Sequence, residues 1–557
     1  VIAAGVLLHY LKTNEQKELK HLNHLYRFQD DCYVGLDRFT VRNLEVLQAL
    51  HPDGKSLVDV LDHTHTPMGA RLLRRWLIFP LQDVQAIEQR QRAVETLVNT
   101  PDSLQAVEDA FQQVGDLERL ISRLATRKIN PRQLQQIRGA LTNAQPVLEL
   151  LENRHAEVMA PWLQQQGDVS AAVETIAQHL QDDCPAAVSK GGVIRAGVSP
   201  ELDEFRQIQE NANGWLDELL QQERQATGIT SLKIGYNKVF GYYLEVTNTH
   251  KDKAPDRWQR KQTLANAERY LTDDLKVLEQ KIFSAEERID QLEQQLYEQL
   301  VNRLAQEVGP LQRQARLLAE LDVLASFARH AVDWRYCKPH LHRHRHLLIQ
   351  EGRHPVIETL LPSESPYVPN DLYLNPDSEQ ILIITGPNMA GKSAVLRQTA
   401  LITLLAHTGA FVPAREAEVP VTDKIYTRVG ASDNLSAGES TFMVEMTETA
   451  RIANNVTHRS LVLLDEIGRG TSTYDGISLA WSLVEFLHNE PEVAAKTLFA
   501  THYHELAELA DQLERVRNYT VKVVERDGRI LFLRKLEPGA SERSFGIHVA
   551  EMAGMPK

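Results

Sequence analysis

The chain has few cysteines and no long apolar run. Its 557 residues include three cysteines, Cys32, Cys184 and Cys337, which lie far apart and form no C-x-x-C pair. This usage argues against a disulfide framework and a cysteine zinc site, and it suits a reducing cytosol. No apolar run reaches the roughly 18–20 residues that a membrane span requires, and no basic segment precedes the apolar residues 1–8, as it would in a signal peptide.

The chain also lacks an excess of positive charge. Its formal charge is −14 at pH 7, so a general nucleic-acid coat protein is disfavoured and any contact with DNA must come from a local basic surface. The length corresponds to roughly four domains of ordinary size. Because the first residue is Val1 and the chain ends at Pro556-Lys557 without an obvious cap, we expect it to be part of a longer protein.

Helical patterns dominate residues 1–200. Amphipathic runs at 106–124 and 132–151 are separated by turn signals such as Asn130-Pro131, and β-branched alternation is scarce. This part of the sequence therefore predicts a helical scaffold with no chemistry of its own.

The middle of the chain predicts a helical arm with a β tip. Residues 202–219 carry one apolar stripe, and a second follows the four-and-three spacing of a coiled coil through Leu271, Leu275, Leu278, Ile282, Ala285, Ile289, Leu292 and Leu296. Between the two stripes, residues 231–246 alternate apolar and polar side chains around the turn glycines Gly235 and Gly241. That texture predicts a β-hairpin or short sheet.

Basic residues cluster at the predicted tip. Those that we select as DNA-binding candidates are Lys233, Lys238, Lys251, Lys253, Arg257, Arg260 and Lys261. The aromatic residues Tyr236, Tyr242, Tyr243 and Trp258 lie between them. Two interpretations stay open: the charges keep a helical hairpin in solution, or they contact phosphates without reading bases.

The last third contains a phosphate-binding motif. Residues 386–393, Gly-Pro-Asn-Met-Ala-Gly-Lys-Ser, fit G-x-x-x-x-G-K-[ST] after a predicted strand at 381–385 and before a helical pattern at 394–405. We therefore predict a nucleotide-binding loop. In such a loop Lys392 would contact the β- and γ-phosphates and Ser393 would bind Mg²⁺. The rest of the loop comprises Gly386, Pro387, Asn388, Met389 and Gly391.

Two further strands carry candidate catalytic residues. The apolar strand 460–464 ends at Asp465, a predicted Mg²⁺ ligand, and Glu466, predicted to polarise the attacking water. A strand at 497–501 precedes His502, which is placed to hydrogen-bond the γ-phosphate. Ser440 precedes a helix, a ready anion site, and in ABC-type ATPases such an element serves the nucleotide of the opposite subunit. These parts predict an α/β ABC-type ATPase that works as a dimer.

A histidine-rich segment remains outside this scheme. His342, His344 and His346 alternate on a predicted strand face and could bind a metal ion. We interpret them instead as a solvated connector.

These motifs resemble those of the MutS family of DNA mismatch repair proteins. The similarity includes Thr385-Gly-Pro-Asn-Met389, Ser440-Thr-Phe-Met-Val-Glu-Met446, Phe499-Ala-Thr-His-Tyr503 and Ser460-Leu-Val-Leu-Leu-Asp-Glu-Ile-Gly-Arg-Gly-Thr-Ser-Thr-Tyr-Asp-Gly476. Upstream it includes Arg42-Asn-Leu-Glu45, Thr66-Pro-Met-Gly69, Gly241-Tyr-Tyr243 and Glu320-Leu-Asp322. It covers nearly the whole chain.

The resemblance implies a multidomain, mostly α fold with a coiled-coil arm and a small β clamp, followed by the α/β ATPase domain. The implied parts are the end of a connector domain at 1–12, a helical core and lever at 13–212, a DNA-gripping clamp at 213–270, a returning lever helix and core at 271–338, and the ATPase and dimerisation domain at 339–557. It also implies that Tyr367 stacks on adenine and that Asn388 contacts the nucleotide. The implied cofactors are ATP and Mg²⁺.

The resemblance implies an ATP-dependent mismatch repair function in which nucleotide closes the clamp on mismatched double-stranded DNA. Expected partners are a second copy of the chain, or three in a full-length tetramer, a MutL-type protein and a sliding clamp. The expected location is the bacterial cytoplasm near the nucleoid, with no membrane contact. Alternatives are a family member that binds branched or recombination DNA, and a DNA clamp that does not hydrolyse nucleotide.

The sequence departs from the family pattern in several places. Ala390 and Ala394 stand where the family usually has glycine and threonine, and neither change removes an identified phosphate ligand. We find no counterpart of the N-terminal domain that wedges a Phe-x-Glu motif into a mismatch, of most of the connector domain, or of the C-terminal helix-turn-helix. The chain as given is therefore expected to lack mismatch reading.

Overall fold

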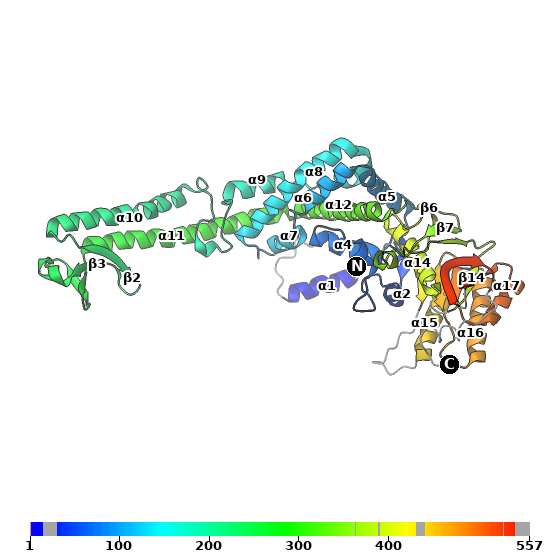
Figure 1. Cartoon of the computed structure of the whole chain (residues 1–557). Coiled ribbons are helices and arrows are strands. Elements are labelled where there is room, and N and C mark those ends of the chain that lie inside the picture. The colour runs from blue at the N-terminus through cyan, green and yellow to red at the C-terminus, as the bar shows by residue number, and fades with distance from the viewer. Residues whose placement is uncertain are drawn as a thin grey trace. The chain divides into compact units, whose positions relative to one another are not determined.

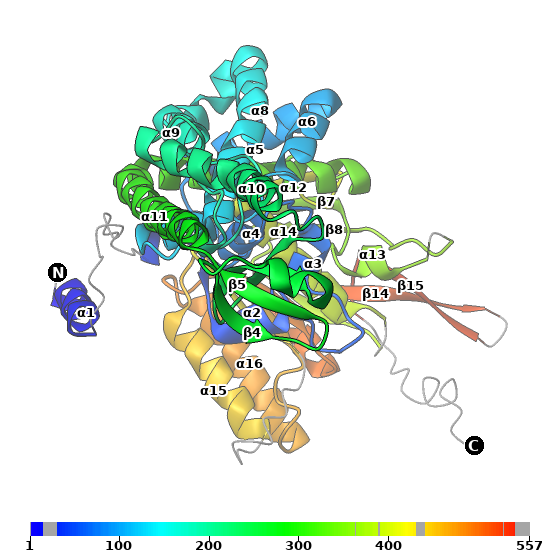
Figure 2. The ribbon, with the colours of Figure 1, turned by 90° about the vertical axis from the view of Figure 1, so that its left-hand side faces the viewer.

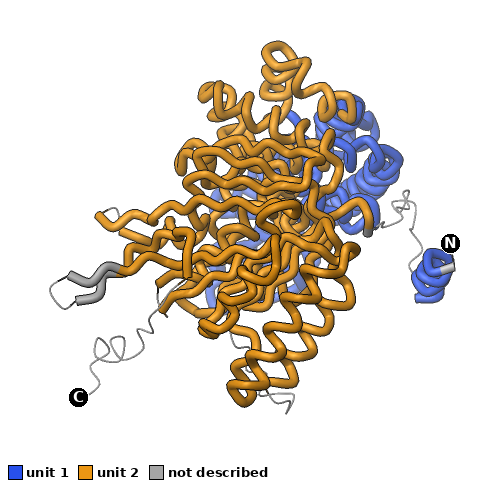
Figure 3. Tube along the Cα trace, turned by 90° about the vertical axis from the view of Figure 1, so that its right-hand side faces the viewer, with its two compact units in different colours: residues 1–23, 117–142, 167–314 blue, residues 24–116, 143–166, 315–557 orange. Residues whose placement is uncertain are grey.

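The computed structural model describes residues 2–14, 30–362, 364–387, 390–429, 441–526 and 529–540. The chain divides into two compact units, shown in two colours in Figure 3. Unit 1 comprises residues 1–23, 117–142 and 167–314, and unit 2 comprises residues 24–116, 143–166 and 315–557. The described residues are rich in helices and form three sheets, so the prediction of a helix-rich, multidomain chain is confirmed.

Unit 1 is built from helices and one small sheet. Its helices are α1 Ile2–Thr13, α7 Leu117–Ala125, α9 Ser170–His179, α10 Pro200–Thr227 and α11 Asp273–Leu304, with short helical turns η2 Val188–Lys190, η3 Asn248–Lys253 and η4 Ala305–Glu307. Helices α8 Pro131–Leu163 and α12 Val308–Trp334 contribute to both units. The predicted run at 106–124 is wrong as one helix, because it is divided between α6 Pro101–Phe111 and α7.

The two long helices of unit 1 begin at conventional capping residues. Ser199 caps α10, Pro200 occupies its first turn, and Gly228 ends it with a φ of 66°. Thr272 caps α11 by accepting a hydrogen bond from the Leu275 amide at 3.1 Å. Leu271 lies in a strand before this cap, so its placement on the helical seam was wrong. Figures 1 and 2 show α10 and α11 side by side.

A four-stranded sheet lies where α10 ends and α11 begins (Figure 1). Its strands occur in the order β2-β3-β5-β4, and their bounds are Lys233–Asn237, Gly241–Thr247, Ala267–Leu271 and Gln259–Thr263 respectively. The predicted hairpin is confirmed as β2 and β3, which pair antiparallel. Gly235 is not a turn residue, however: it lies inside β2, where a Cβ would come within 2.6 Å of the Tyr243 ring. Gly241 is the turn glycine, with a φ of 76°.

Unit 2 begins with helices and then alternates strands and helices. The first part contains η1 Asp30–Cys32, β1 Gly35–Leu36, α2 Arg38–Asn43, α3 Leu57–Leu61, α4 Pro67–Ile78, α5 Val84–Asn99 and α6 Pro101–Phe111. The part after residue 339 contains β6 His340–His342, β7 Leu347–Gly352, α13 Ile357–Leu360, β8 Asn370–Leu374, β9 Ile381–Thr385, α14 Lys392–Thr408, β10 Glu416–Pro420, β11 Lys424–Arg428, α15 Thr441–Asn455, β12 Leu461–Asp465, α16 Thr473–Asn489, β13 Lys496–Ala500, η6 His504–Glu508, α17 Leu509–Gln512, β14 Val516–Arg526 and β15 Arg529–Pro538.

A seven-stranded sheet organises the last third of the chain. Its order is β1-β11-β12-β13-β9-β14-β15, and every neighbouring pair is parallel except β14 and β15. The three strands predicted in this region are confirmed as β9, β12 and β13, within one residue at each end. A second sheet has the order β6-β10-β7-β8.

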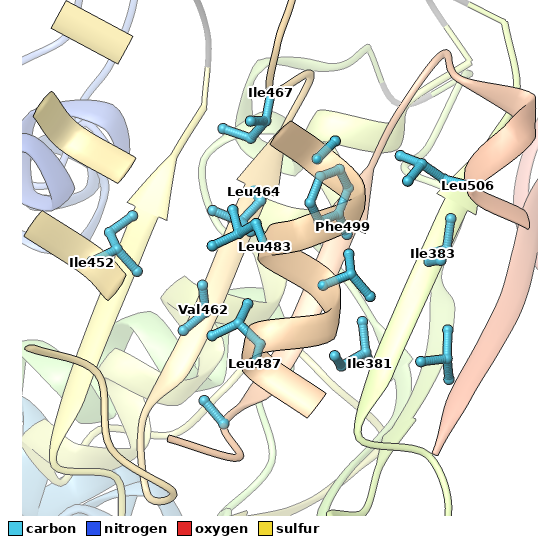
Figure 4. Packing of buried hydrophobic residues seen from close by; sticks show 14 of the residues in the cluster. Ile381, Ile383, Ile452, Val462, Leu464, Ile467, Leu483, Leu487, Phe499 and Leu506 are labelled. Atoms are coloured by element: carbon cyan, nitrogen blue, oxygen red, sulfur yellow. The ribbon is translucent and has the colours of Figure 1, made fainter. Parts of the chain in front are cut away.

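The central strands of the seven-stranded sheet are buried on both faces. Ile381, Ile383, Val462, Leu464 and Phe499 pack with α16 in one hydrophobic cluster (Figure 4). The alternate residues of β9 and β12 are also fully buried. Such strands read as continuous apolar runs, because helices cover both faces of a parallel sheet.

A buried aspartate explains why two distant motifs occur together in unit 2. Asp322, on α12, accepts hydrogen bonds from the amides of His65 and Thr66 at 3.0 and 2.9 Å, and from the Thr66 hydroxyl at 2.6 Å. A Cβ at Gly69 would lie 2.2 Å from the same carboxylate. The carboxylate therefore fixes the start of α4 and requires a glycine beside it.

Candidate functional site

Three neighbouring strands bring the predicted catalytic segments together. In the order β12-β13-β9, Asp465 lies opposite Ala500, and Ala500 lies opposite Ile384. The loop that begins at Gly386 and the residues Glu466 and His502 therefore all follow the carboxyl ends of adjacent parallel strands. Ligands bind at this edge in open α/β sheets.

The first two residues after β9 contact a buried lysine. Gly386 and Gly391 have φ values of 135° and 102°, which side-chain-bearing residues rarely adopt. Lys392 begins α14, and its ammonium donates to the carbonyl oxygens of Gly386 at 2.6 Å and Pro387 at 3.1 Å. Burial lowers the pKa of Lys392 to about 8, partly offset by the charges of Glu466 and Asp465. Asn388 and Met389 lie outside the described residues.

Ser393 and Asp465 meet across the strand end. The Ser393 hydroxyl donates to Oδ2 of Asp465 at 2.5 Å. The other carboxylate oxygen, Oδ1, is buried and has no hydrogen-bond partner. Burial raises the pKa of Asp465, the Ser393 hydrogen bond lowers it, and the nearby Glu466 raises it further. A buried carboxylate oxygen without a partner fits a bound cation, because such oxygens are rarely left unsatisfied.

Glu466 lies between a histidine and an arginine. Its Oε1 accepts from Nε2 of His502 at 2.6 Å, and its Oε2 forms an ion pair with Arg469. Burial alone would raise the pKa of Glu466, but the His502 hydrogen bond and the Arg469 charge hold it below its usual range. The backbone of Glu466 has a φ of 59°, a conformation that is costly for a residue with a long side chain. Arg469 was missed in the sequence, although its position three residues after Glu466 could have indicated it.

The segment after Glu466 is attached to α15. The amide of Gly468 donates to Oε1 of Glu445 at 2.5 Å, and a Cβ at Gly470 would come within 2.9 Å of Phe442. Ser440, predicted to serve a partner's nucleotide, lies outside the described residues, and α15 begins with the next residue, Thr441.

Tyr367 is half-buried on the segment before β8. Its hydroxyl donates to Oε1 of Gln398 on α14 at 3.0 Å, and burial raises its pKa well above the usual range. The hydrogen bond attaches Tyr367 to the same helix that begins with Lys392, and Gln398 was not singled out in the sequence.

The seven basic candidates for DNA binding all belong to unit 1, whereas the residues described above belong to unit 2. All seven are exposed. Arg257 forms an ion pair with Glu223 at 2.6 Å, and Arg260 forms one with Glu268 at 3.3 Å. Trp258 is buried in the hydrophobic cluster of the small sheet, so it is a core residue rather than part of an exposed binding surface.

No helix among the described residues is long and apolar enough to cross a membrane.

Comparisons with known proteins agree with this arrangement. Residues 39–328 match the family model of MutS domain III, and residues 382–557 match that of MutS domain V. The chain is 51% identical over 556 residues to the DNA mismatch repair protein MutS of Cytophaga hutchinsonii, with 100% of this chain and 65% of the relative covered. It is 52% identical over 557 residues to the protein of that name from Christiangramia forsetii, with 100% and 64% covered.

The chain thus spans slightly less than two thirds of the length of these curated relatives. One family model alone matches more than half of its 557 residues. A second matches the segment that carries Lys392, Ser393, Asp465, Glu466 and His502, which we call the strand-end cluster. The chain belongs to the MutS family of DNA mismatch repair proteins.

Proposed function

We propose that this chain binds ATP with Mg²⁺ at the strand-end cluster and hydrolyses it, as the ATPase part of a mismatch repair protein. One observation carries the proposal: Ser393, Asp465, Glu466 and His502, from three separate strand ends, are joined by the hydrogen bonds Ser393–Asp465 and His502–Glu466. A hydroxyl and a carboxylate able to hold a metal ion thus lie beside a carboxylate able to accept a proton.

Lys392 and the loop glycines would bind the phosphates. The ammonium of Lys392 donates to two neutral carbonyl oxygens of its own loop. Phosphate oxygens carry negative charge and are stronger acceptors, so a triphosphate would take over these donors. The start of α14 adds backbone N–H groups and the favourable end of a helix dipole.

Ser393 and Asp465 would hold Mg²⁺. A hydroxyl and one carboxylate suit this ion, which prefers oxygen ligands and keeps several waters. Held there, Mg²⁺ would neutralise negative charge that develops on the phosphates during transfer. The unsatisfied Oδ1 of Asp465 is the atom that gains most from such a cation.

Glu466 would accept the proton of the attacking water. Its lowered pKa keeps the carboxylate ionised at neutral pH. The water oxygen forms the new bond to the γ-phosphorus, the bond between that phosphorus and the β–γ bridging oxygen breaks, and the water proton passes to Glu466. His502 holds Oε1 of Glu466 from the side and would contact the γ-phosphate.

We extend the proposal to a dimer of this chain and to the longer protein. Ser440 of one copy would complete the site of a second copy, Tyr367 would stack on adenine, and ATP-driven closure would change the grip of the exposed lysines of unit 1 on double-stranded DNA. In a longer protein, mismatch recognition and contacts with a MutL-type protein and a sliding clamp would be added, in the bacterial cytoplasm.

Steady-state ATP hydrolysis and direct nucleotide titration test the core of this proposal. Lys392→Ala should weaken ATP binding, because one charge-assisted hydrogen bond is worth about 1.5–3 kcal/mol. The matched control is Lys338→Ala, which removes an exposed lysine of unit 2 paired with Glu95 and should leave binding unchanged. Binding without any hydrolysis by the unaltered chain would instead favour the non-hydrolysing clamp.

A further inference from the structure

The second sheet of unit 2 contains a histidine cluster. None of the interactions described above connects this cluster with the proposed nucleotide site. His342 ends β6, His346 immediately precedes β7, and Glu418 lies in β10, the strand between them. The prediction that His342, His344 and His346 share a single strand face is wrong, because the chain turns between β6 and β7. The structure adds Glu418, which sequence spacing could not have indicated.

The potential ligand atoms of this cluster are close together. Single nitrogen or oxygen atoms of His342, His346 and Glu418 all lie within 4.8 Å of one another. Nε2 of His346 lies 2.7 Å from Oε2 of Glu418, and the rings of His342 and His346 stack with centroids 4.5 Å apart. Ligands of a tetrahedral zinc ion are separated by about 3.4 Å, given bond lengths of about 2.0–2.2 Å. Rotation of the two half-buried side chains, His346 and Glu418, can supply the remaining difference of about 1.4 Å between 4.8 Å and the zinc spacing.

His342 is the member of the cluster that most needs a partner. It is 7% exposed, and neither of its ring nitrogens makes a hydrogen bond within ordinary limits of distance and angle. Burial lowers the pKa of His342 and the adjacent His346 lowers it further, while a backbone interaction with His344 offsets this in part, so the balance favours the neutral ring. A neutral, buried imidazole without a hydrogen bond is unfavourable in a protein interior, and a metal ion would satisfy it. The interpretation of His342 as solvated is therefore wrong.

The neighbouring positive charges line a different part of the surface. Arg343, His344 and Arg345 line a pocket with Arg459 and Lys496, and neither His342 nor His346 contributes to that pocket. His344 is also absent from the group of clustered ligand atoms. The candidate ligands His342 and His346 therefore lie apart from the intervening side chains, which line the pocket.

We propose that His342, His346 and Glu418 bind one divalent transition-metal ion of the zinc class. Two imidazoles and a carboxylate suit zinc, nickel or copper, whereas the oxygen ligands Ser393 and Asp465 suit magnesium, so the two sites select different ions. Water completes the fourth position. The ion would join the β6–β7 turn to β10 and would replace the hydrogen bond between His346 and Glu418.

Zinc titration of the metal-free, nucleotide-free chain tests this proposal, with a chromogenic chelator as competitor. The full chain should bind one Zn²⁺ that is lost in His342→Ala and in His346→Ala, with affinity falling at least about tenfold, the smallest cost usual for disturbing even an outer-shell group. Bound Zn²⁺ should also raise the unfolding temperature of the unaltered chain, because it binds only the folded state. Excess Mg²⁺ should not displace it.

His344→Ala is the matched control, because it removes a histidine of the same segment that lies outside the group. It should bind zinc as the unaltered chain does. Glu418→Gln and His346→Ala alter half-buried side chains, so their metal-free unfolding temperatures should stay unchanged even if His342→Ala affects folding. Equal zinc affinity and stoichiometry in all variants, or loss of binding in His344→Ala as well, would overturn the proposal, as would absence of zinc binding at micromolar concentrations.

Discussion

Ser393 donates a 2.5 Å hydrogen bond to Asp465, although 72 residues separate them along the chain. The pairing follows from the parallel order of the sheet, in which β9 and β12 flank β13 and end at the same edge. It leaves one buried oxygen of Asp465 unsatisfied. Two residues from different motifs therefore come together at the proposed Mg²⁺ site.

Glu466→Gln should bind ATP but hydrolyse it about 10²–10⁴-fold more slowly, the usual contribution of a positioned general base. The amide keeps the size of the side chain but cannot accept the proton of water. Single-turnover hydrolysis, together with nucleotide titration, measures the two effects separately. Glu505→Gln, an exposed residue just after His502, is the control. Normal turnover in Glu466→Gln would show that another group accepts the proton.

ATP affinity should depend on pH through Lys392. In the free protein its pKa is lowered to about 8 by burial, and the bound triphosphate should raise that value because it favours the ammonium. Affinity should thus be constant below about pH 8 and fall by at most about tenfold per pH unit above it. Lys392→Arg keeps its charge throughout this range and should remove the dependence. Titrations from pH 7 to 9.5 test this, and identical pH profiles for both proteins would exclude Lys392 as the titrating group.

Removal of Arg206 should destabilise unit 1. Arg206 pairs with Glu293 at 2.5 Å, and the Glu293 carboxylate is about 1% exposed and also accepts from the amides of Gly192 and Val193. Arg206→Ala leaves that charge buried without its counter-ion, at a cost of about 3–5 kcal/mol. Urea unfolding measures the loss, and faster amide exchange at residues 192–193 would locate it.

The control for this prediction is a comparable pair on the surface of the same helices. Arg288 pairs with Glu201 at 2.8 Å, and both side chains are about half exposed. Arg288→Ala should cost less than about 1 kcal/mol, because solvent screens the pair. Equal losses in the two variants would mean that burial does not determine the strength of the Arg206 pair.

Exposed lysines of unit 1 should determine the salt dependence of the proposed DNA binding. Lys251 and Lys253 are exposed on η3. If both contact phosphates, the double alanine variant should lower the slope of log affinity against log salt by about two, since each neutralised phosphate contributes about 0.9. Affinity should fall similarly for matched and mismatched duplexes. Arg288→Ala should leave the slope unchanged, and an unaltered slope in the double variant would place the DNA contact elsewhere.

The strands and most of the candidate site could be predicted because each depends on local chemistry. An apolar run followed by Asp465-Glu466, or by a glycine-rich loop and Lys392, is typical of a strand that leads into a nucleotide-binding site. Parallel strands then bring these segments to the same edge of the sheet. Glu418 could not be predicted, because its meeting with His346 depends on the pairing of β10 between β6 and β7.

Other errors arose where packing overrides a local signal. Gly235 has the composition of a turn residue, but the adjacent Tyr243 ring requires a glycine inside the strand. Trp258 lies among lysines and arginines in the sequence, which suggested an exposed binding surface, yet its indole fills the core between the small sheet and the helices. In both cases the deciding neighbour is supplied by another strand or helix.

The hydrogen bond between Gly468 and Glu445 has a mechanical consequence. It ties the turn after Glu466 to α15, whose first residue follows Ser440. Glu445 also forms a buried ion pair with Arg428 of β11 at 3.7 Å, which holds the glutamate in place. Any movement of this turn would therefore reach α15, the helix that follows the residue proposed to serve the nucleotide of a second copy. In the proposed dimer, hydrolysis in one copy would then affect nucleotide binding by the other.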